Sequence, residues 1–302
     1  MNVFIAAFTN NVLPILLAAG AGVILGWKTD IHPESLSKLA MYVLTPSLIF
    51  ELLTSNPISG ADILVMLAFT AAVTLAVVLL MGGLGFAFRW PKSIIAAAVL
   101  ASLATNAGNY GLSLNQFAFG APALPYASLF MVGNSLITYT LGIAVASWGS
   151  GKPGNPLTAP FKYPLLYAFL LGLVFSRFHL SLPLPVDRVV SLFSAGAIPT
   201  MLVLLGVQLS KCNWQRPSLA LSLTNATRLI TSPVLAIGLA AIFALQGPAR
   251  QAGILQAAMP TAVTATVLAA EFNLEPSFLT VSVVLSTLFS ALTLTPLIVF
   301  LS

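Results

Sequence analysis

Apolar segments of about 20 residues or more follow one another along almost the whole chain of 302 residues. Segments of this length fit the roughly 30 Å hydrocarbon core of a bilayer, which an α-helix crosses in about 20 residues. Only 6% of the residues are charged, against about 25% in a typical soluble domain, so the chain cannot cover a water-soluble surface. Because lipid offers no hydrogen bonds to the backbone, the spans must be helices or a closed barrel, and short alternating barrel strands do not fit these long runs. The sequence therefore predicts an all-α membrane protein.

Polar and turn residues divide the apolar sequence into ten predicted transmembrane helices. The predicted spans are 3–27, 34–54, 61–88, 92–119, 125–148, 162–179, 186–209, 217–246, 248–271 and 276–301. A polar linker, 149–161, separates the fifth span from the sixth. An even number of spans predicts that both ends of the chain lie on the same side of the membrane.

Positive charge is unequally shared between the two sets of loops that connect these spans. One set contains Lys28, Lys38, Arg89, Lys92, Lys152, Lys162, Lys211 and Arg216, and the other contains Arg177, Arg188 and Arg250. Loops rich in lysine and arginine stay in the cytoplasm. The pattern predicts an inner (plasma) membrane protein with a cytoplasmic linker and both termini outside.

Prolines recur at a nearly constant spacing in the two halves of the chain. Pro46 in span two and Pro199 in span seven are 153 residues apart, and the same shift takes Ala107 in span four to Pro260 in span nine. This spacing predicts two five-helix repeats, 1–148 and 162–302. Because each repeat has an odd number of spans, the second repeat is inserted in the membrane in the opposite orientation to the first. The alternative is a chance alignment, since proline is common in membrane helices.

Spans four and nine contain residues that interrupt helices at matched positions of the two repeats. Gly108 and Gly111 weaken helix continuity in span four, and Pro260 removes a backbone donor in span nine. A broken helix exposes free N–H groups and a positive dipole end at mid-membrane, which favours binding of an anion. The adjacent polar side chains Asn106, Asn109 and Thr261 are candidate ligands. The alternative is a pair of kinks at which the asparagines only pack between helices.

Several segments in this order resemble the auxin efflux carrier family, which includes plant auxin exporters and bacterial permeases ascribed to malonate and malate. They are residues 12–15 with Gly22 and Gly26, 44–50, 106–112 and 259–260. The resemblance covers nearly the whole chain. The family often has a proline shortly after the span-four asparagine and glycine, where this chain has Ser113. The short linker, in place of the long cytosolic loop of many plant members, favours a bacterial-type permease.

The resemblance implies a fold similar to the bile-acid symporters and the sodium–proton antiporters. Spans 1, 2, 6 and 7, with Pro46 and Pro199, would form a scaffold, and spans 3–5 and 8–10 a transport domain that moves like an elevator. The substrate would lie where spans four and nine cross. The expected binding residues there are Asn106, Asn109, Tyr110, Pro260, Thr261 and Thr264.

Two charged side chains lie within predicted spans. Arg228 is about 16 Å along span eight and shares a helical face with Thr224, Thr231 and Ser232. An intramembrane arginine points to a function, here as ligand or counter-charge for an anion, and the alternative is a structural tie to backbone carbonyls. Glu51 lies near the outer end of span two, where it is either a coupling group or a side chain that reaches the interface.

The expected function is secondary active transport of a small organic anion, such as a dicarboxylate or an auxin-like acid. The expected partners are that anion and the lipid bilayer; a homodimer and the coupling ion, H⁺ or Na⁺, stay open. No phosphate-binding loop, metal-ligand spacing or intramembrane histidine is present, so neither an enzyme, a metal site nor a cofactor is expected. Loop asymmetry explains the net charge of +5 better than nucleic-acid binding does. A membrane subunit of an ATP-driven transporter and a channel or sensor remain as alternatives.

Overall fold

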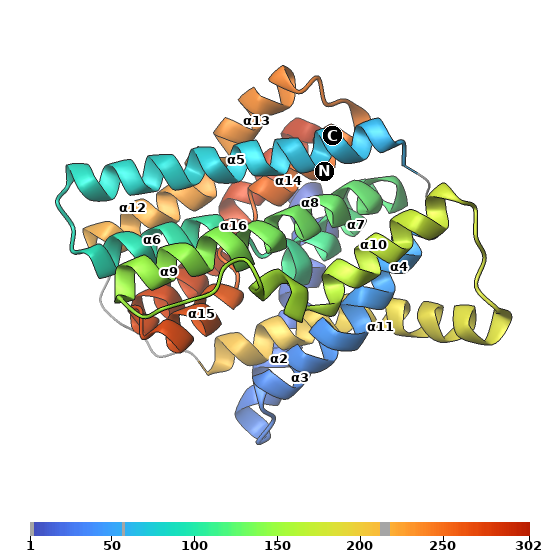
Figure 1. The fold of residues 1–302 in the computed structure, drawn as a ribbon, viewed down its shortest axis with the longest axis horizontal. Helices are drawn as coiled ribbons and strands as arrows, with labels where there is room; N and C mark the ends of the chain where they lie inside the picture. Colours follow the sequence, from blue (N-terminus) through green and yellow to red (C-terminus); the bar gives the residue numbers. More distant parts are fainter. Residues whose placement is uncertain (1–2, 56–57, 212–217) are drawn as a thin grey trace.

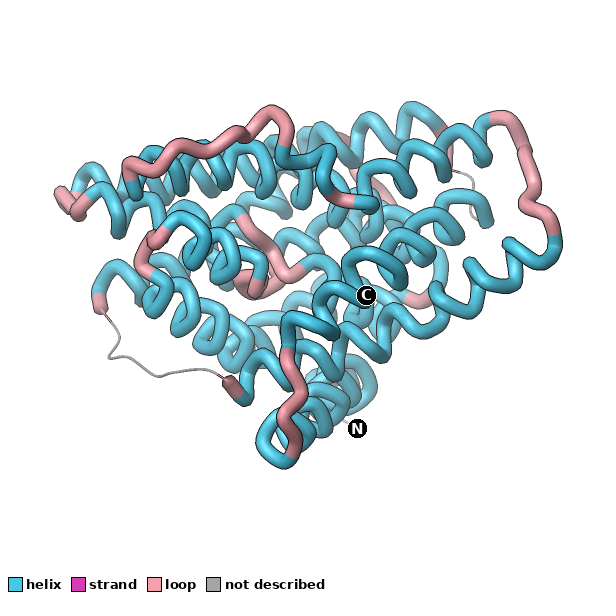
Figure 2. Tube along the Cα trace, turned by 60° about the horizontal axis from the view of Figure 1, so that its bottom comes forward, coloured by secondary structure: helices cyan, strands magenta, loops and turns pink. Residues whose placement is uncertain are grey.

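The computed structural model describes residues 3–55, 58–211 and 218–302, and its regular elements in these ranges are helices (Figure 1). Figure 2 shows helix almost throughout, with short loops between the segments. The predicted all-α class is therefore confirmed. Arg216, one of the residues used to predict the orientation, lies outside the described residues.

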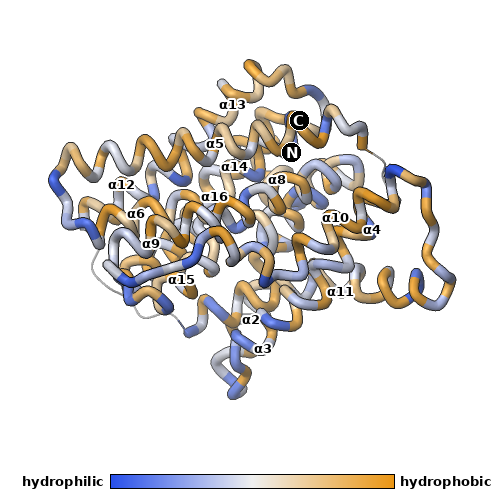
Figure 3. Tube along the Cα trace, in the orientation of Figure 1, coloured by the Kyte–Doolittle hydropathy of each residue, from blue (hydrophilic) through white to orange (hydrophobic). Residues whose placement is uncertain are grey.

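Seven helical segments in the described ranges are long and apolar enough to cross a membrane. They are Val3–Lys28, Pro33–Ser55, Gly60–Ala87, Ala121–Ser150, Leu184–Ser210, Leu219–Ile242 and Pro276–Leu301. Figure 3 shows hydrophobic residues along these helices and hydrophilic residues mainly at helix ends and in loops. Such a distribution suits helices whose middles face lipid and whose ends face water.

Three of these segments are single helices, and four are built from shorter pieces. The single helices are α5 (Gly60–Ala87), α11 (Leu184–Ser210) and α16 (Pro276–Leu301). The composite segments are α1 (Val3–Ala7), η1 (Phe8–Val12) and α2 (Leu13–Lys28); α3 (Pro33–Leu39), η2 (Ala40–Leu44) and α4 (Thr45–Ser55); η4 (Ala121–Ala123), α8 (Leu124–Ile137), η5 (Thr138–Gly142) and α9 (Ile143–Ser150); and α12 (Leu219–Ala226), η7 (Thr227–Thr231) and α13 (Ser232–Ile242).

The other three predicted spans contain shorter helices. Predicted span six contains η6 (Ala159–Lys162) and α10 (Pro164–Arg177). Predicted span four is α6 (Lys92–Leu103) followed, after a break, by η3 (Ala107–Leu112) and α7 (Ser113–Phe119). Predicted span nine is α14 (Gly247–Ala257) and, after a break, α15 (Thr264–Phe272). Both interruptions occur in the two spans in which the sequence predicted them.

Three π-helical turns end two residues before a proline. These turns are η1, η2 and η7, and the prolines are Pro14, Pro46 and Pro233. Proline lacks an N–H and its ring clashes with the carbonyl four residues earlier, so a wider turn there removes the clash without ending the helix. Pro199, which the repeat pairs with Pro46, lies inside the continuous helix α11.

The helices pack as two groups. Helices α2, α11, α4 and α10 contact one another in that order, and in Figure 1 they extend, with α3, from the bottom centre to the right. The other group contains α5, α6, α8, α9 and α12 to α16, which contact one another around the two broken helices. Within the first group α2 and α11 touch closely, because a Cβ atom at Gly206 would overlap the main-chain oxygen of Ala19.

Candidate functional site

The two breaks cross each other inside the protein. Thr105, in the first break, and Thr261, in the second, form an isolated antiparallel β-bridge. Two main-chain hydrogen bonds of 2.8 Å define it, from Asn106 N–H to the Pro260 carbonyl and from Ala262 N–H to the Ala104 carbonyl. An unpaired buried backbone group costs about 1–3 kcal/mol, so each break satisfies the other. The crossing therefore depends on both halves of the chain.

Four helix ends meet at this bridge. Helices α6 and α14 end there with their carbonyl groups, and η3 and α15 begin there with their N–H groups. Each C-terminal end is equivalent to roughly half a negative charge and each N-terminal end to roughly half a positive charge. The crossing is therefore a buried site with strong local fields and few charged side chains.

The interruption of span four lies at residues 104–106. The sequence predicts it a few residues later, at Gly108 and Gly111. Ala104 is extended, and helical structure resumes at Ala107, so Gly108 and Gly111 lie within η3. Gly111 instead allows close packing, because a Cβ atom there would overlap Oε1 of Gln256 on α14. The extended residues are held by their pairing with the second break.

Asn134 on α8 fixes the first break. Its side chain is 3% exposed, and its Oδ1 accepts hydrogen bonds from the N–H (3.2 Å) and the hydroxyl (2.9 Å) of Thr105. Its Nδ2 donates to the carbonyl of Leu103 (2.8 Å) and to the hydroxyl of Thr74 (3.4 Å). The sequence analysis missed this residue. The available signal was the single amide of predicted span five, because a buried amide is costly unless it is hydrogen-bonded.

Ser286 on α16 occupies the corresponding place at the second break. Its hydroxyl accepts a hydrogen bond from the N–H of Thr261 at 3.1 Å. The Thr261 hydroxyl in turn donates to the carbonyl of Ala101 at 3.0 Å, so it is bonded to the end of α6. Each break is thus held by a polar side chain from the next predicted span, span five for the first break and span ten for the second.

Arg228 lies in η7 and points into the protein, with 2% of its surface exposed. Its Nη1 donates to the carbonyl of Ser102 in the last turn of α6 (2.8 Å), and its Nε to that of Met259 in the second break (2.7 Å). Its Nη2 donates to the carbonyl of Ala257, the last residue of α14. The guanidinium therefore joins the C-terminal ends of both half-helices, where its charge opposes their dipoles.

A cavity of about 30 Å³, measured as the space open to the centres of water molecules, borders the bridge. Polar side chains that line it are Thr105, Asn134, Ser135, Thr138, Tyr139 and Thr264. None of the lining residues has a charged side chain. Thr138 is 3% exposed, and its hydroxyl has no partner among the described residues. The ring of Tyr139 stacks on that of Tyr163, just before α10, with centroids 3.9 Å apart.

The predicted binding residues are spread around the crossing. Thr264 lines the cavity, and Thr261 and Pro260 are buried at the bridge. Asn106 is 4% exposed, and its Nδ2 has no partner among the described residues. Asn109 is half-buried, outside the cavity lining, and its carbonyl accepts a hydrogen bond from Ser113.

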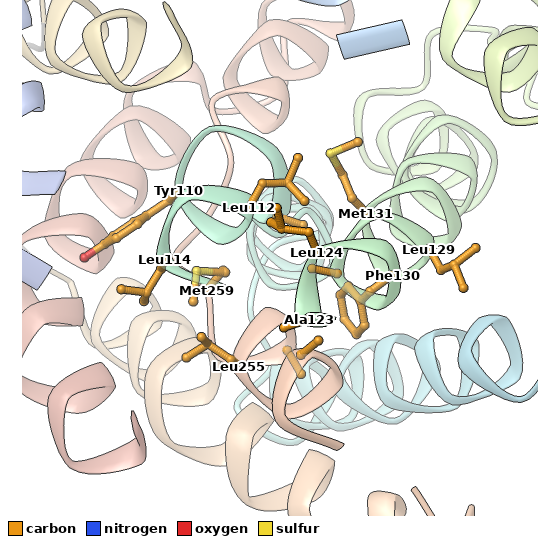
Figure 4. Close-up of a cluster of buried hydrophobic side chains, with 14 of the residues drawn as sticks. Tyr110, Leu112, Leu114, Ala123, Leu124, Leu129, Phe130, Met131, Leu255 and Met259 are labelled. Atoms are coloured by element: carbon orange, nitrogen blue, oxygen red, sulfur yellow. The ribbon is translucent and has the colours of Figure 1, made fainter. Parts of the chain in front are cut away.

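Tyr110 and Glu51 lie away from the cavity lining. Tyr110 is buried in the hydrophobic cluster of Figure 4, where its side chain points away from Phe130 and Met131. Its hydroxyl accepts a hydrogen bond from Ser290 of α16 at 3.3 Å. Glu51 on α4 accepts a hydrogen bond of 2.7 Å from Ser191 on α11, so it links two helices of the first group.

Long apolar helices that enclose two crossed breaks are typical of a membrane protein, and the similar proteins are described as transporters. Residues 157–298 match the family model of the membrane transport proteins. An uncharacterized transporter of Methanothermobacter thermautotrophicus is 28% identical over 95% of this chain and 96% of its own length. A "putative malonate transporter" of Rhizobium meliloti is 23% identical over 97% of this chain and 95% of its own.

A plant protein matches a shorter part of the chain. The auxin efflux carrier component 3a of Oryza sativa is 28% identical over 41% of this chain, which is 21% of its own length. The chain is therefore similar over nearly its whole length to proteins described as transporters, and over part of it to a plant auxin efflux carrier.

Proposed function

We propose that this protein is a secondary active transporter that binds a small organic anion at the crossing of the two breaks. The observation that supports this most is the Thr105–Thr261 bridge, which gathers four helix ends beside a polar cavity. Half-helix N-termini at mid-membrane favour anionic groups of a substrate without a permanently charged lining. The malonate named for the relative in Rhizobium meliloti suggests a carboxylate.

The proposal includes ten spans arranged as two inverted repeats, 1–148 and 162–302, joined by the linker 149–161. Spans four, six and nine would be completed by the shorter helices, with the breaks inside spans four and nine. The contacts among α2, α4, α10 and α11 support a scaffold of spans 1, 2, 6 and 7. The second group of helices would be the transport domain, and its movement past the scaffold would expose the cavity to each side in turn.

We assign Arg228 the role of a fixed counter-charge rather than of a direct ligand. Carbonyl groups of Ser102, Ala257 and Met259 already accept from its Nη1, Nη2 and Nε. Without the guanidinium, two negative helix ends would lie close together in a medium of low dielectric constant, and the crossing would lose the positive charge that attracts an anion. Arg228 would thus act on the substrate through the helix ends that it neutralises.

Counterflow in proteoliposomes tests the carrier function. Vesicles preloaded with unlabelled malonate should accumulate external labelled malonate transiently, because a carrier exchanges substrate across the membrane. Uptake that saturates with concentration is expected as well. A channel would equilibrate the label without a transient excess, and that result would contradict the proposal.

Substitution at the crossing tests the site. Asn106→Ala should reduce uptake by about 5- to 150-fold, because losing an amide that pairs with substrate costs about 1–3 kcal/mol. Arg228→Gln should reduce uptake of a carboxylate more than uptake of its neutral amide, and Arg228→Lys should retain partial activity, since charge survives but the planar fork is lost. Arg188→Gln, which removes the charge of an exposed arginine on α11, is the control. Equal carboxylate uptake by Arg228→Gln and wild type would reduce Arg228 to a structural tie.

A further inference from the structure

The net charge of the crossing is the sum of four helix-end charges and the charge of Arg228. The two C-terminal ends, of α6 and α14, contribute about one negative charge together, and the two N-terminal ends, of η3 and α15, about one positive charge. These four main-chain contributions cancel. What remains is the single positive charge of Arg228, which lies within hydrogen-bond distance of both C-terminal ends.

The side chains that line the cavity leave this total unchanged. Tyr139 is the single titratable residue in the lining, and the other lining side chains are alanines, hydroxyls and the Asn134 amide. Glu51 accepts a hydrogen bond from Ser191 in the other group of helices and is not in the lining. With the site empty, the crossing therefore keeps a net charge of about +1, as the helix-end charges imply.

The cavity next to the bridge has hydroxyl groups and space that suit one carboxylate group. Thr264, the first residue of α15, lines the cavity, and so does Thr138, whose buried hydroxyl has no partner in the described ranges. A buried hydroxyl with no partner is costly, so it is suited to donate to a ligand oxygen. The 30 Å³ space exceeds the roughly 10–15 Å³ that a cavity needs to hold one water, so a small polar group such as one carboxylate can enter it.

We infer that the crossing accepts one negative charge at a time: a monocarboxylate, or a dicarboxylate that carries one proton. This inference rests on the proposed transport function and specifies its substrate. A single carboxylate would bring the net charge of the crossing to about zero. A dianion would leave one uncompensated negative charge buried away from water, which is strongly unfavourable.

The test compares two probes that share a carbon skeleton, malonate and its monoamide, malonamate. Counterflow of each is measured in proteoliposomes from about pH 5 to pH 8, across the second ionisation of malonate. Malonamate remains a monoanion over this range and corrects for any effect of pH on the protein. The ratio of malonate to malonamate uptake should fall at least about tenfold as malonate becomes a dianion. Binding, measured as the rise in melting temperature that each probe causes, should fall in parallel.

The outcomes separate this inference from the proposed function. A ratio that stays constant or rises with pH would overturn the charge limit and leave carboxylate transport intact. Transport of neither probe by folded protein would contradict the proposed carboxylate transport, and the charge limit with it. If the ratio of malonate to malonamate uptake falls with pH but the corresponding binding does not, the preference for a monoanion does not arise at the binding site. That result would also overturn the inference.

Discussion

Replacement of Asn134 separates the role of its hydrogen bonds from that of its volume. Its side chain pairs with two main-chain groups of the first break, the N–H of Thr105 and the carbonyl of Leu103. Asn134→Leu fills the space with an apolar group and leaves both unpaired. Asn134→Ala also removes the partners, but it opens space next to a cavity that already holds room for water. We therefore expect leucine to destabilise the protein more than alanine does.

The expected magnitudes follow from these contacts. Each buried main-chain group left without a partner costs about 1–3 kcal/mol, so Asn134→Leu should lower the free energy of unfolding by about 2–6 kcal/mol. In Asn134→Ala, water can pair with both groups, and a loss of about 1–2 kcal/mol is expected, since a bridging water is nearly as good as a direct hydrogen bond. The larger, more hydrophobic residue would then be the worse substitution, even within a transmembrane helix.

Denaturant unfolding of purified protein in detergent measures the three stabilities. The control is Ser135→Ala, because Ser135 also lines the cavity but takes no part in the hydrogen bonds between Asn134 and the first break. It should change the free energy of unfolding by less than about 0.5 kcal/mol. If Asn134→Leu is as stable as Asn134→Ala, or more so, the hydrogen bonds to the break are not what Asn134 contributes.

Two further predictions concern packing and orientation. Gly206→Leu should destabilise the protein by about 1–3 kcal/mol or more in the same unfolding assay, because its side chain would overlap the Ala19 carbonyl at the α2–α11 contact. Gly238→Ala, where a Cβ atom meets nothing within 4 Å, should be neutral or slightly stabilising. A cysteine at Ser150, in a chain whose Cys212 is replaced by serine, should react with an impermeant thiol reagent only after spheroplasts are permeabilised. Labelling of intact spheroplasts would place the linker outside.

The sequence predicts much of this fold because lipid imposes simple rules on it. Span three, predicted at 61–88, is the helix Gly60–Ala87, since an apolar run bounded by charged and turn residues allows little else in a bilayer. The interruption of span nine is also found where Pro260 predicts it. The bounds of span three and the interruption of span nine depend on residues that are close together in the sequence, so a single sequence is enough to predict them.

The contacts at the crossing depend on residues that are far apart in the sequence. The first break lies at 104–106 rather than at Gly108 because it pairs with main chain about 155 residues later, and no local pattern encodes that partner. The three carbonyls that accept hydrogen bonds from Arg228 are main-chain groups. Because every residue has such a group, the sequence does not identify them. Arg228 is buried on the helical face that the sequence shows it to share with Thr224 and Ser232, but only the structure shows which groups it binds.

The β-bridge between Thr105 and Thr261 also has a consequence for biosynthesis. When a ribosome has delivered the first half of the chain to the membrane, the Asn106 N–H and the Ala104 carbonyl do not yet have the partners that they have in the finished protein. Those partners arrive only after the second half has been synthesised and inserted. We therefore expect that the two halves, expressed alone, are degraded or held by chaperones, whereas their co-expression as separate chains restores folded protein.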